Sequence, residues 1–244
     1  MKIFDPNPQL SWLFCMTHPD DEIALAAWIK RLTNQGNRVY MSWTHSNPMR
    51  EKEARLVSDQ LGIPQDHLYF FNAPDGRVAE SIESLLPKFQ SMVSEIQPDK
   101  VVSCAYEQGH IDHDATNFLV NHSYAGEVLE FPLYHTYLTR FPIINSFADP
   151  QDQAVLSLAY EEQRFKVHIA KQYPSQTIWR NLFWYEVAQV LQFKSANLRK
   201  FEKMRVQTHK DYLTPHLPEP LLSKVLQCDL WKRWHSIISS FHRS

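Results

Sequence analysis

The string His18-Pro19-Asp20-Asp21-Glu22 places an imidazole beside three carboxylates, directly after a short apolar run. A histidine and an aspartate three residues apart can face one metal ion, so His18 and Asp21 are candidate ligands. Asp20 lies between them, points elsewhere, and is a candidate general base for hydrolysis. Capping of a following helix by the acidic residues is the alternative, but capping does not account for the adjacent histidine and proline.

A second polar cluster, His110-Ile111-Asp112-His113-Asp114, occurs later in the chain. His110 and His113 are three residues apart at the start of a predicted helix. One of them can bind a metal while the other faces the substrate. A lone histidine is usually structural, but a pair with intervening and following aspartates is less easily explained in that way.

The two clusters together predict a hydrolytic metal centre. His18, Asp21 and His113 would supply two nitrogens and one carboxylate, leaving an open position on Zn²⁺ for a water whose pKa falls to about 7. Asp20 would act as the base, and His110 would hydrogen-bond the substrate carbonyl oxygen as charge develops on it. The same ligand types also describe non-haem iron sites, so Fe²⁺ stays a minor alternative. The reaction class is hydrolysis of an amide or ester.

The elements that must position these residues alternate between apolar strands and amphipathic helices. This pattern predicts a Rossmann-like α/β fold, with a mostly parallel sheet and helices on both faces. Parallel sheets bind ligands at the carboxyl ends of their strands, and both clusters follow predicted strands. We expect strands at 12–17, 38–44, 67–71, 100–106 and 128–138, and helices at 20–33, 51–61, 80–96 and 114–123. Pro87 is expected to kink or split the third helix.

The pattern changes after residue 150 and becomes largely helical. We expect helices over 154–172, 177–191, 196–206 and 221–241. The chain is therefore predicted to form a catalytic domain over residues 1–180 and a helical C-terminal extension over residues 181–244, packed on the same domain.

Composition narrows the class of protein. The chain has 244 residues and a formal net charge of −2, which argues against a general nucleic-acid-binding protein. No run approaches the roughly 18 apolar residues of a membrane span, and the first residues do not have the pattern of a secretory signal. The three cysteines, Cys15, Cys104 and Cys228, are widely spaced, which is typical of reduced thiols in a cytoplasmic protein. The oligomeric state is left open.

At this point the motifs resemble those of the PIG-L/LmbE-like zinc N-deacetylases. The string at 18–22 matches that family's first motif in full, and the His-x-Asp-His element at 110–113 matches its second. Weaker resemblances bring the similar region to residues 12–178: Thr44, Arg50-x-x-Glu53, Leu61-Gly62, Asp75-Gly76 and Tyr173-Pro174-Ser175-Gln176.

The resemblance implies zinc held by His18, Asp21 and His113, with Asp20 as base and His110 as oxyanion stabiliser or acid. It implies removal of an N-acetyl group from an N-acetylglucosaminyl-type amino-sugar conjugate, a small-molecule substrate, with release of acetate. The alternatives are an amidase acting on a larger N-acyl conjugate and a non-catalytic sugar-binding protein with the same fold.

Two further residues are weaker candidates for substrate binding. Arg50 is a candidate contact to a sugar or phosphate, although a salt bridge to Glu51 or Glu53 explains it equally well. Gln108 stands where some members of the family carry a tyrosine, so stabilisation of the carbonyl is expected to depend more on His110 and the metal.

Overall fold

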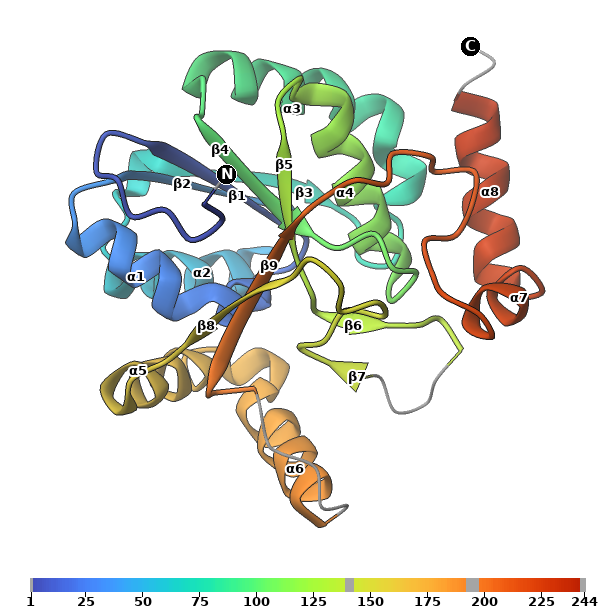
Figure 1. Ribbon diagram of the computed structural model, residues 1–244. Coiled ribbons are helices and arrows are strands. Elements are labelled where there is room, and N and C mark those ends of the chain that lie inside the picture. Colours follow the sequence, from blue (N-terminus) through green and yellow to red (C-terminus); the bar gives the residue numbers. More distant parts are fainter. Residues whose placement is uncertain (1, 139–142, 192–197, 242–244) are drawn as a thin grey trace.

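The computed structural model describes residues 2–138, 143–191 and 198–241. Its centre is a seven-stranded sheet in the order β3-β2-β1-β4-β5-β9-β8 (Figure 1). The first five strands in that order are parallel, and β9 and β8 are antiparallel to their neighbours. The strands are β1 (Ser11–Met16), β2 (Arg38–His45), β3 (Leu68–Ala73), β4 (Lys100–Cys104), β5 (Val128–Phe131), β8 (Ala154–Ser157) and β9 (Phe201–Val206).

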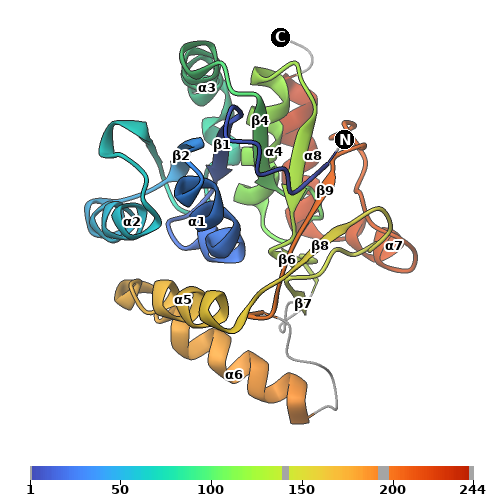
Figure 2. The same cartoon turned by 60° about the vertical axis from the view of Figure 1, so that its left-hand side comes forward.

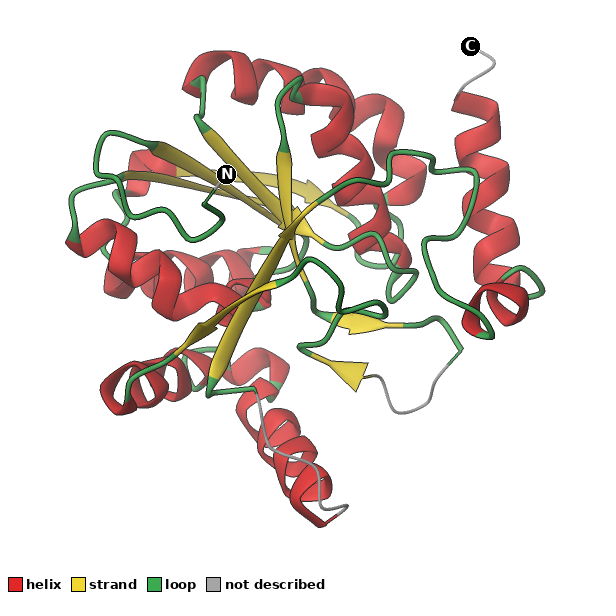
Figure 3. Ribbon diagram, in the orientation of Figure 1, coloured by secondary structure: helices red, strands yellow, loops and turns green. Residues whose placement is uncertain are grey.

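Helices cover both faces of this sheet, as the red and yellow elements of Figure 3 show. Two separate apolar cores result, one on each face. The first core includes residues of α1 (Ala26–Asn34), α2 (Pro48–Leu61) and α5 (Tyr160–Ala170). The second includes residues of α3 (Ile82–Ile96), α4 (Ile111–Ser123), α7 (Leu221–Val225) and α8 (Asp229–Phe241). The predicted α/β class is therefore confirmed.

β1 shows how the sequence produces these two layers. Alternate side chains of a strand point to opposite faces, and Trp12 and Phe14 enter the first core whereas Leu13 and Cys15 enter the second. All four side chains are fully buried. Burial on both faces is why this strand reads as a continuous apolar run instead of an alternating one.

The region after residue 150 differs from the sequence prediction. Residues 154–172 form β8 followed by α5, and the helix expected over 196–206 is wrong because residues 201–206 form β9. Residues 192–197 lie outside the described part of the chain. β9 carries charged residues, but Glu202 is fully buried and accepts hydrogen bonds from Ala27 N and Trp28 N. These backbone donors allow a carboxylate to be buried in this strand.

Two smaller differences concern the other elements. α3 runs through Pro87 without a break. The strand expected over 128–138 is split into β5 and β6 (Tyr134–His135), and β6 pairs with β7 (Ile143–Ile144) in a separate two-stranded sheet. The division of the chain at residue 180 stays a proposal.

One helix stands apart from the sheet. α6 (Ile178–Leu191) extends away from the rest of the molecule in two views (Figures 1 and 2). None of its residues is buried, although most are apolar. Within the described residues, no helix has both the length and the apolar character needed to cross a membrane.

Candidate metal centre and active site

The turn after β1 holds its side chains by backbone hydrogen bonds. Asp21 Oδ2 accepts from Thr17 N at 2.9 Å and from His18 N at 2.8 Å, so this oxygen is committed to the turn. The other oxygen, Asp21 Oδ1, lies 3.6 Å from His113 Nε2. The turn therefore orients one carboxylate oxygen toward the residue that comes from α4.

Asp20 adopts a backbone conformation that side-chain-bearing residues rarely use, with φ 120°. Such strain persists only where the surrounding structure holds it, and it is frequent at functional sites. Glu22 provides part of that support, because its carboxylate accepts from Asp20 N at 3.1 Å and from the Tyr173 hydroxyl. Burial raises the pKa of Glu22 to about 7. Glu22 is therefore a support for the turn, whereas Asp20 lines the cavity.

The second cluster begins α4. His110 is the residue before the helix, and its Nδ1 accepts a hydrogen bond from Asp112 N at 3.2 Å. A neutral His110 ring consequently carries its proton on Nε2, from which it can donate into the cavity that it lines. Burial, and then the charge of His18, lower the pKa of His110, which favours that neutral form.

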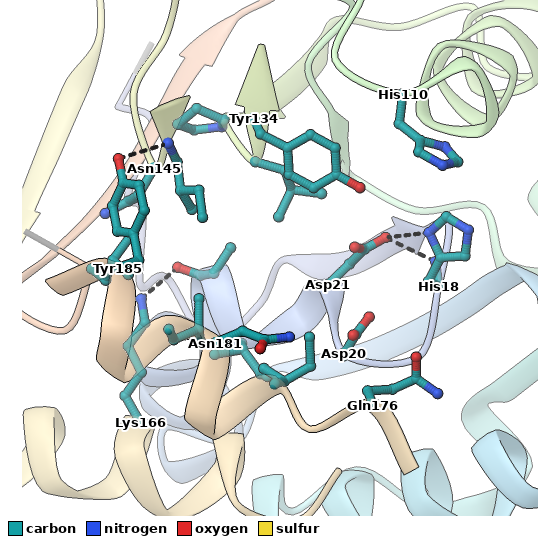
Figure 4. Close-up of a pocket in the computed structure, with 18 of the residues that line it drawn as sticks. His18, Asp20, Asp21, His110, Tyr134, Asn145, Lys166, Gln176, Asn181 and Tyr185 are labelled. Atoms are coloured by element: carbon teal, nitrogen blue, oxygen red, sulfur yellow. Dashed lines mark hydrogen bonds and ion pairs between the residues drawn. The ribbon is translucent and has the colours of Figure 1, made fainter. Parts of the chain in front are cut away.

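The turn before α4 needs a glycine at position 109, because the backbone of Tyr134 lies very close to it. A Cβ atom at Gly109 would lie 1.7 Å from the Tyr134 carbonyl oxygen. Only glycine lets β6 pack against the turn that carries His110. Tyr134 lines the same cavity as His110, and Figure 4 shows its hydroxyl pointing toward the end where Asp21 and His18 lie.

His18, Asp21 and His113 converge from segments far apart in the sequence. His18 Nδ1 lies 3.2 Å from His113 Nε2, and one donor atom from each of the three residues falls within 4.8 Å of the others. All three residues are buried. In a tetrahedral zinc site, ligand atoms about 2.1 Å from the ion are about 3.4 Å apart. The donor set and its spacing fit one zinc ion.

A second group, His18, His110 and Asp112, also meets the distance condition for a metal. However, both oxygens of Asp112 already accept hydrogen bonds, from Gly76 N at 2.7 Å and from Val78 N at 3.0 Å. Asp112 therefore holds the 76–78 turn in place, and the group containing Asp21 is the better candidate.

The cluster carries an excess of carboxylates. Burial opposes protonation of His18, but Asp112 and Asp75 raise the pKa of His18 to about 10. Burial, and then the charge of Asp21, raise the pKa of Asp20 well above its usual range. Both shifts show that the site favours added positive charge, and a divalent cation supplies such charge.

The two weaker candidates lie in different settings. Arg50 lines the cavity, donates to Gln176 Oε1 and lies 3.7 Å from Asp75 Oδ2. Gln108 is fully buried, and its Oε1 accepts from His216 N at 2.9 Å. Gln108 is not among the residues that line the cavity, so the structure does not place it at a bound substrate.

Sequence reasoning missed two residues of the site. Asp75 was recognised only as part of a turn, but its Oδ1 lies 3.3 Å from His18 Nε2. Tyr134 was expected in the middle of a long strand. No local signal marks either residue, because each reaches the site through a loop or a short strand that the sheet brings close.

The part of the chain that holds both polar clusters is similar to a known protein family. Residues 13–124 match the family model described as PIG-L: GlcNAc-PI de-N-acetylase, which confirms the resemblance found in the sequence. No curated protein sequence matches the chain.

Several solved structures are similar in fold. A deacetylase triple mutant from the teicoplanin biosynthetic pathway has a TM-score of 0.63 and 17% identity, over 82% of this chain and 99% of that one. The zinc-inhibited form of teicoplanin deacetylase Orf2 has a TM-score of 0.58 and 17% identity, over 82% and 100%. N,N′-diacetylchitobiose deacetylase from Pyrococcus horikoshii has a TM-score of 0.53 and 18% identity, over 83% and 85%. At these identities the likeness establishes the fold.

Proposed function

We propose that this chain, whose residues 13–124 match the PIG-L family model, is a zinc-dependent N-deacetylase of an amino-sugar conjugate. The observation that carries the proposal is the convergence of His18, Asp21 and His113, with Asp20 and His110 beside them on one cavity. The names of the similar structures agree with it, since they include a diacetylchitobiose deacetylase and a teicoplanin deacetylase.

Each residue has a distinct part in the proposed reaction. Zinc held by His18, Asp21 and His113 supplies a Lewis acid. Asp20 takes a proton from the water that attacks the amide carbon, since it lines the cavity beside the metal ligands. His110 donates its Nε2 hydrogen to the carbonyl oxygen as negative charge develops there. Asp20 passes its proton to the nitrogen as the C–N bond breaks, so that acetate and the free amine leave.

Sugar binding is assigned to the polar groups beside the metal ligands. Arg50 and Gln176 hydrogen-bond each other and both line the cavity, as does Asp75. Groups of this kind bind hydroxyls of a sugar ring when they are held in place by neighbours. Glu53 provides that hold, because it accepts hydrogen bonds from the backbone and the hydroxyl of Ser175, next to Gln176.

The test is a screen for acetate release from N-acetylated monosaccharides, disaccharides and glycosides. Protein stripped with a chelator is compared with the same protein after zinc is returned. We expect acetate release that disappears with the metal and reappears with zinc. Absence of acetate release from every amino sugar, with zinc bound at one equivalent, would contradict the proposed function.

A further inference from the structure

The cavity at the candidate metal centre is much larger than the cluster needs. Its volume is about 930 Å³, at the upper end of the roughly 300–1,000 Å³ typical of small-molecule sites. Its acidic residues, with Arg50 and Gln176, lie at the end of the metal ligands, and the far end is mostly apolar, with the polar side chains of Asn145, Lys166 and Asn181. Beyond the metal ligands, the cavity continues between α6 and the β6–β7 pair (Figure 4).

One wall of this continuation is a single face of α6. Ile178, Asn181, Leu182, Tyr185 and Ala188 all line the cavity. Their spacing of i, i+3, i+4, i+7 and i+10 places them along one side of a helix. From the first to the last of these positions the helix rises about 15 Å, so the wall is long enough for an extended group.

The opposite wall includes the apolar residues Pro132, Leu133 and Ile144, and its Asn145 side chain donates to Phe201 O at 3.2 Å. The two walls are tied together, because Ile144 N donates to the Tyr185 hydroxyl at 3.1 Å. We call the space between them the α6 trough. It is continuous with the candidate metal centre within one cavity.

Within the described parts of the chain, Lys166 is the cationic residue that lines the trough, and it is already paired. Lys166 Nζ donates to Ala24 O at 2.7 Å and to Glu202 at 3.1 Å. Its charge is therefore compensated by the protein, and the trough has no free charge from Lys166 to bind an anion. Apolar surface that folding does not bury indicates a ligand when it lines a concave site.

We propose that the α6 trough binds an apolar group attached to the amino sugar. Two parts of a substrate supply that chemistry: an N-acyl chain longer than acetyl, or an alkyl or aryl aglycone. This inference rests on the proposed function for the amide at the polar end, but the trough can be tested without turnover.

The first experiment measures binding of n-alkyl glucosides, which have no amide to cleave, by calorimetry. We expect Kd to fall about fourfold for each added methylene until the trough is filled, because each buried methylene contributes about 0.8 kcal/mol. A Kd that does not change from methyl to decyl glucoside would overturn the proposal.

A matched pair of variants locates the effect. Ala188→Trp places a large ring in the trough, whereas Val190→Trp places the same ring on the exposed side of the same helix. Ala188→Trp is expected to abolish the chain-length dependence and leave methyl glucoside binding unchanged. Val190→Trp is expected to behave as wild type. Equal effects of the two substitutions would contradict the assigned wall.

A second experiment identifies the part of the substrate that enters the trough. Release of free amine is measured for an N-acyl series with a methyl aglycone and for an N-acetyl series with alkyl aglycones. If kcat/KM rises with chain length in one series, the group that is varied in that series is the one that enters the α6 trough. Turnover without chain-length dependence in either series refutes the trough; chain-dependent glucoside binding without any turnover refutes the proposed function and leaves the trough standing.

Discussion

The two ends of the cavity differ in the burial of their side chains and in the hydrogen bonds that hold them. At the polar end, short turns after β1 and β4 carry buried side chains whose remaining atoms are fixed by backbone donors, as in Asp21 and Asp112. At the other end, α6 has no buried residue and contributes mostly apolar side chains. Fixed side chains suit the proposed reaction, and a mostly apolar wall suits the proposed binding of an apolar group.

The two ends of the cavity come from different parts of the fold. The parallel part of the sheet positions the proposed ligands and the proposed base, and α6, outside that sheet, lines the other end of the cavity. Changes at the polar end should therefore remove the reaction, whereas changes at α6 should alter selectivity or stability.

The largest expected effect is from His113→Ala. Loss of partners behind a ligand typically costs about 10–100-fold in metal affinity, so loss of a ligand should cost more than about 100-fold. Zinc content after dialysis, and activity, should both collapse. His235→Ala changes an exposed histidine of α8 and serves as the control. Full zinc occupancy in the His113 variant would show that His113 is not a ligand and would make His110 the candidate for the third ligand.

Asp20→Asn tests the base separately from the metal. Removing a general base typically lowers the rate by about 10²- to 10⁴-fold, and we expect that loss in kcat with one zinc retained. Elemental analysis and steady-state kinetics on the same sample make the distinction. Wild-type turnover in this variant would exclude Asp20 as the base.

Acidification should weaken zinc binding. His18 holds a proton up to a pKa of about 10, and that proton must leave before the ring can ligate. Zinc affinity should therefore rise by up to about tenfold per unit as pH increases toward that value, and fall on acidification. Competition with a chromophoric chelator between pH 6 and pH 8 measures this slope. A flat profile would show that His18 binds without releasing a proton.

Gly109→Ala should disturb the junction between the two ends. Its Cβ atom would meet the Tyr134 carbonyl oxygen at 1.7 Å, and neither backbone can move freely. Overpacking of this kind costs about 1–3 kcal/mol of folding free energy. Chemical denaturation gives the cost. An unchanged midpoint and an unchanged kcat would mean that β6 does not need to pack against the His110 turn.

The smallest expected effect is from Tyr185→Phe. It removes the acceptor of the hydrogen bond from Ile144 N, worth about 1 kcal/mol. Stability should fall by about that amount, with zinc binding and turnover of a short-chain substrate unchanged. A loss of zinc in this variant would show that the α6 wall and the metal centre are not independent.

The parallel part of the fold and the two polar clusters could be identified from the order of the amino acids alone. Strands buried on both faces are continuous apolar runs, so 12–17 and 100–106 were recognisable, and the polar clusters follow them directly. The proposed ligands could also be named from the sequence, because they lie in two short segments with recognisable spacing. The apolar runs and the polar clusters can both be identified from residues that are close together in the sequence.

The remaining features depend on contacts between distant segments. A helix was expected over 196–206, but residues 201–206 form β9, and the burial of Glu202 against Ala27 N and Trp28 N is a contact that no local pattern predicts. Asp75 and Tyr134 join the site, and Gln108 turns away from it toward His216 N, for the same reason. The spacing of apolar residues predicts which face of a helix or strand is buried. It does not predict the partner of a buried polar group, because that partner comes from a distant part of the chain.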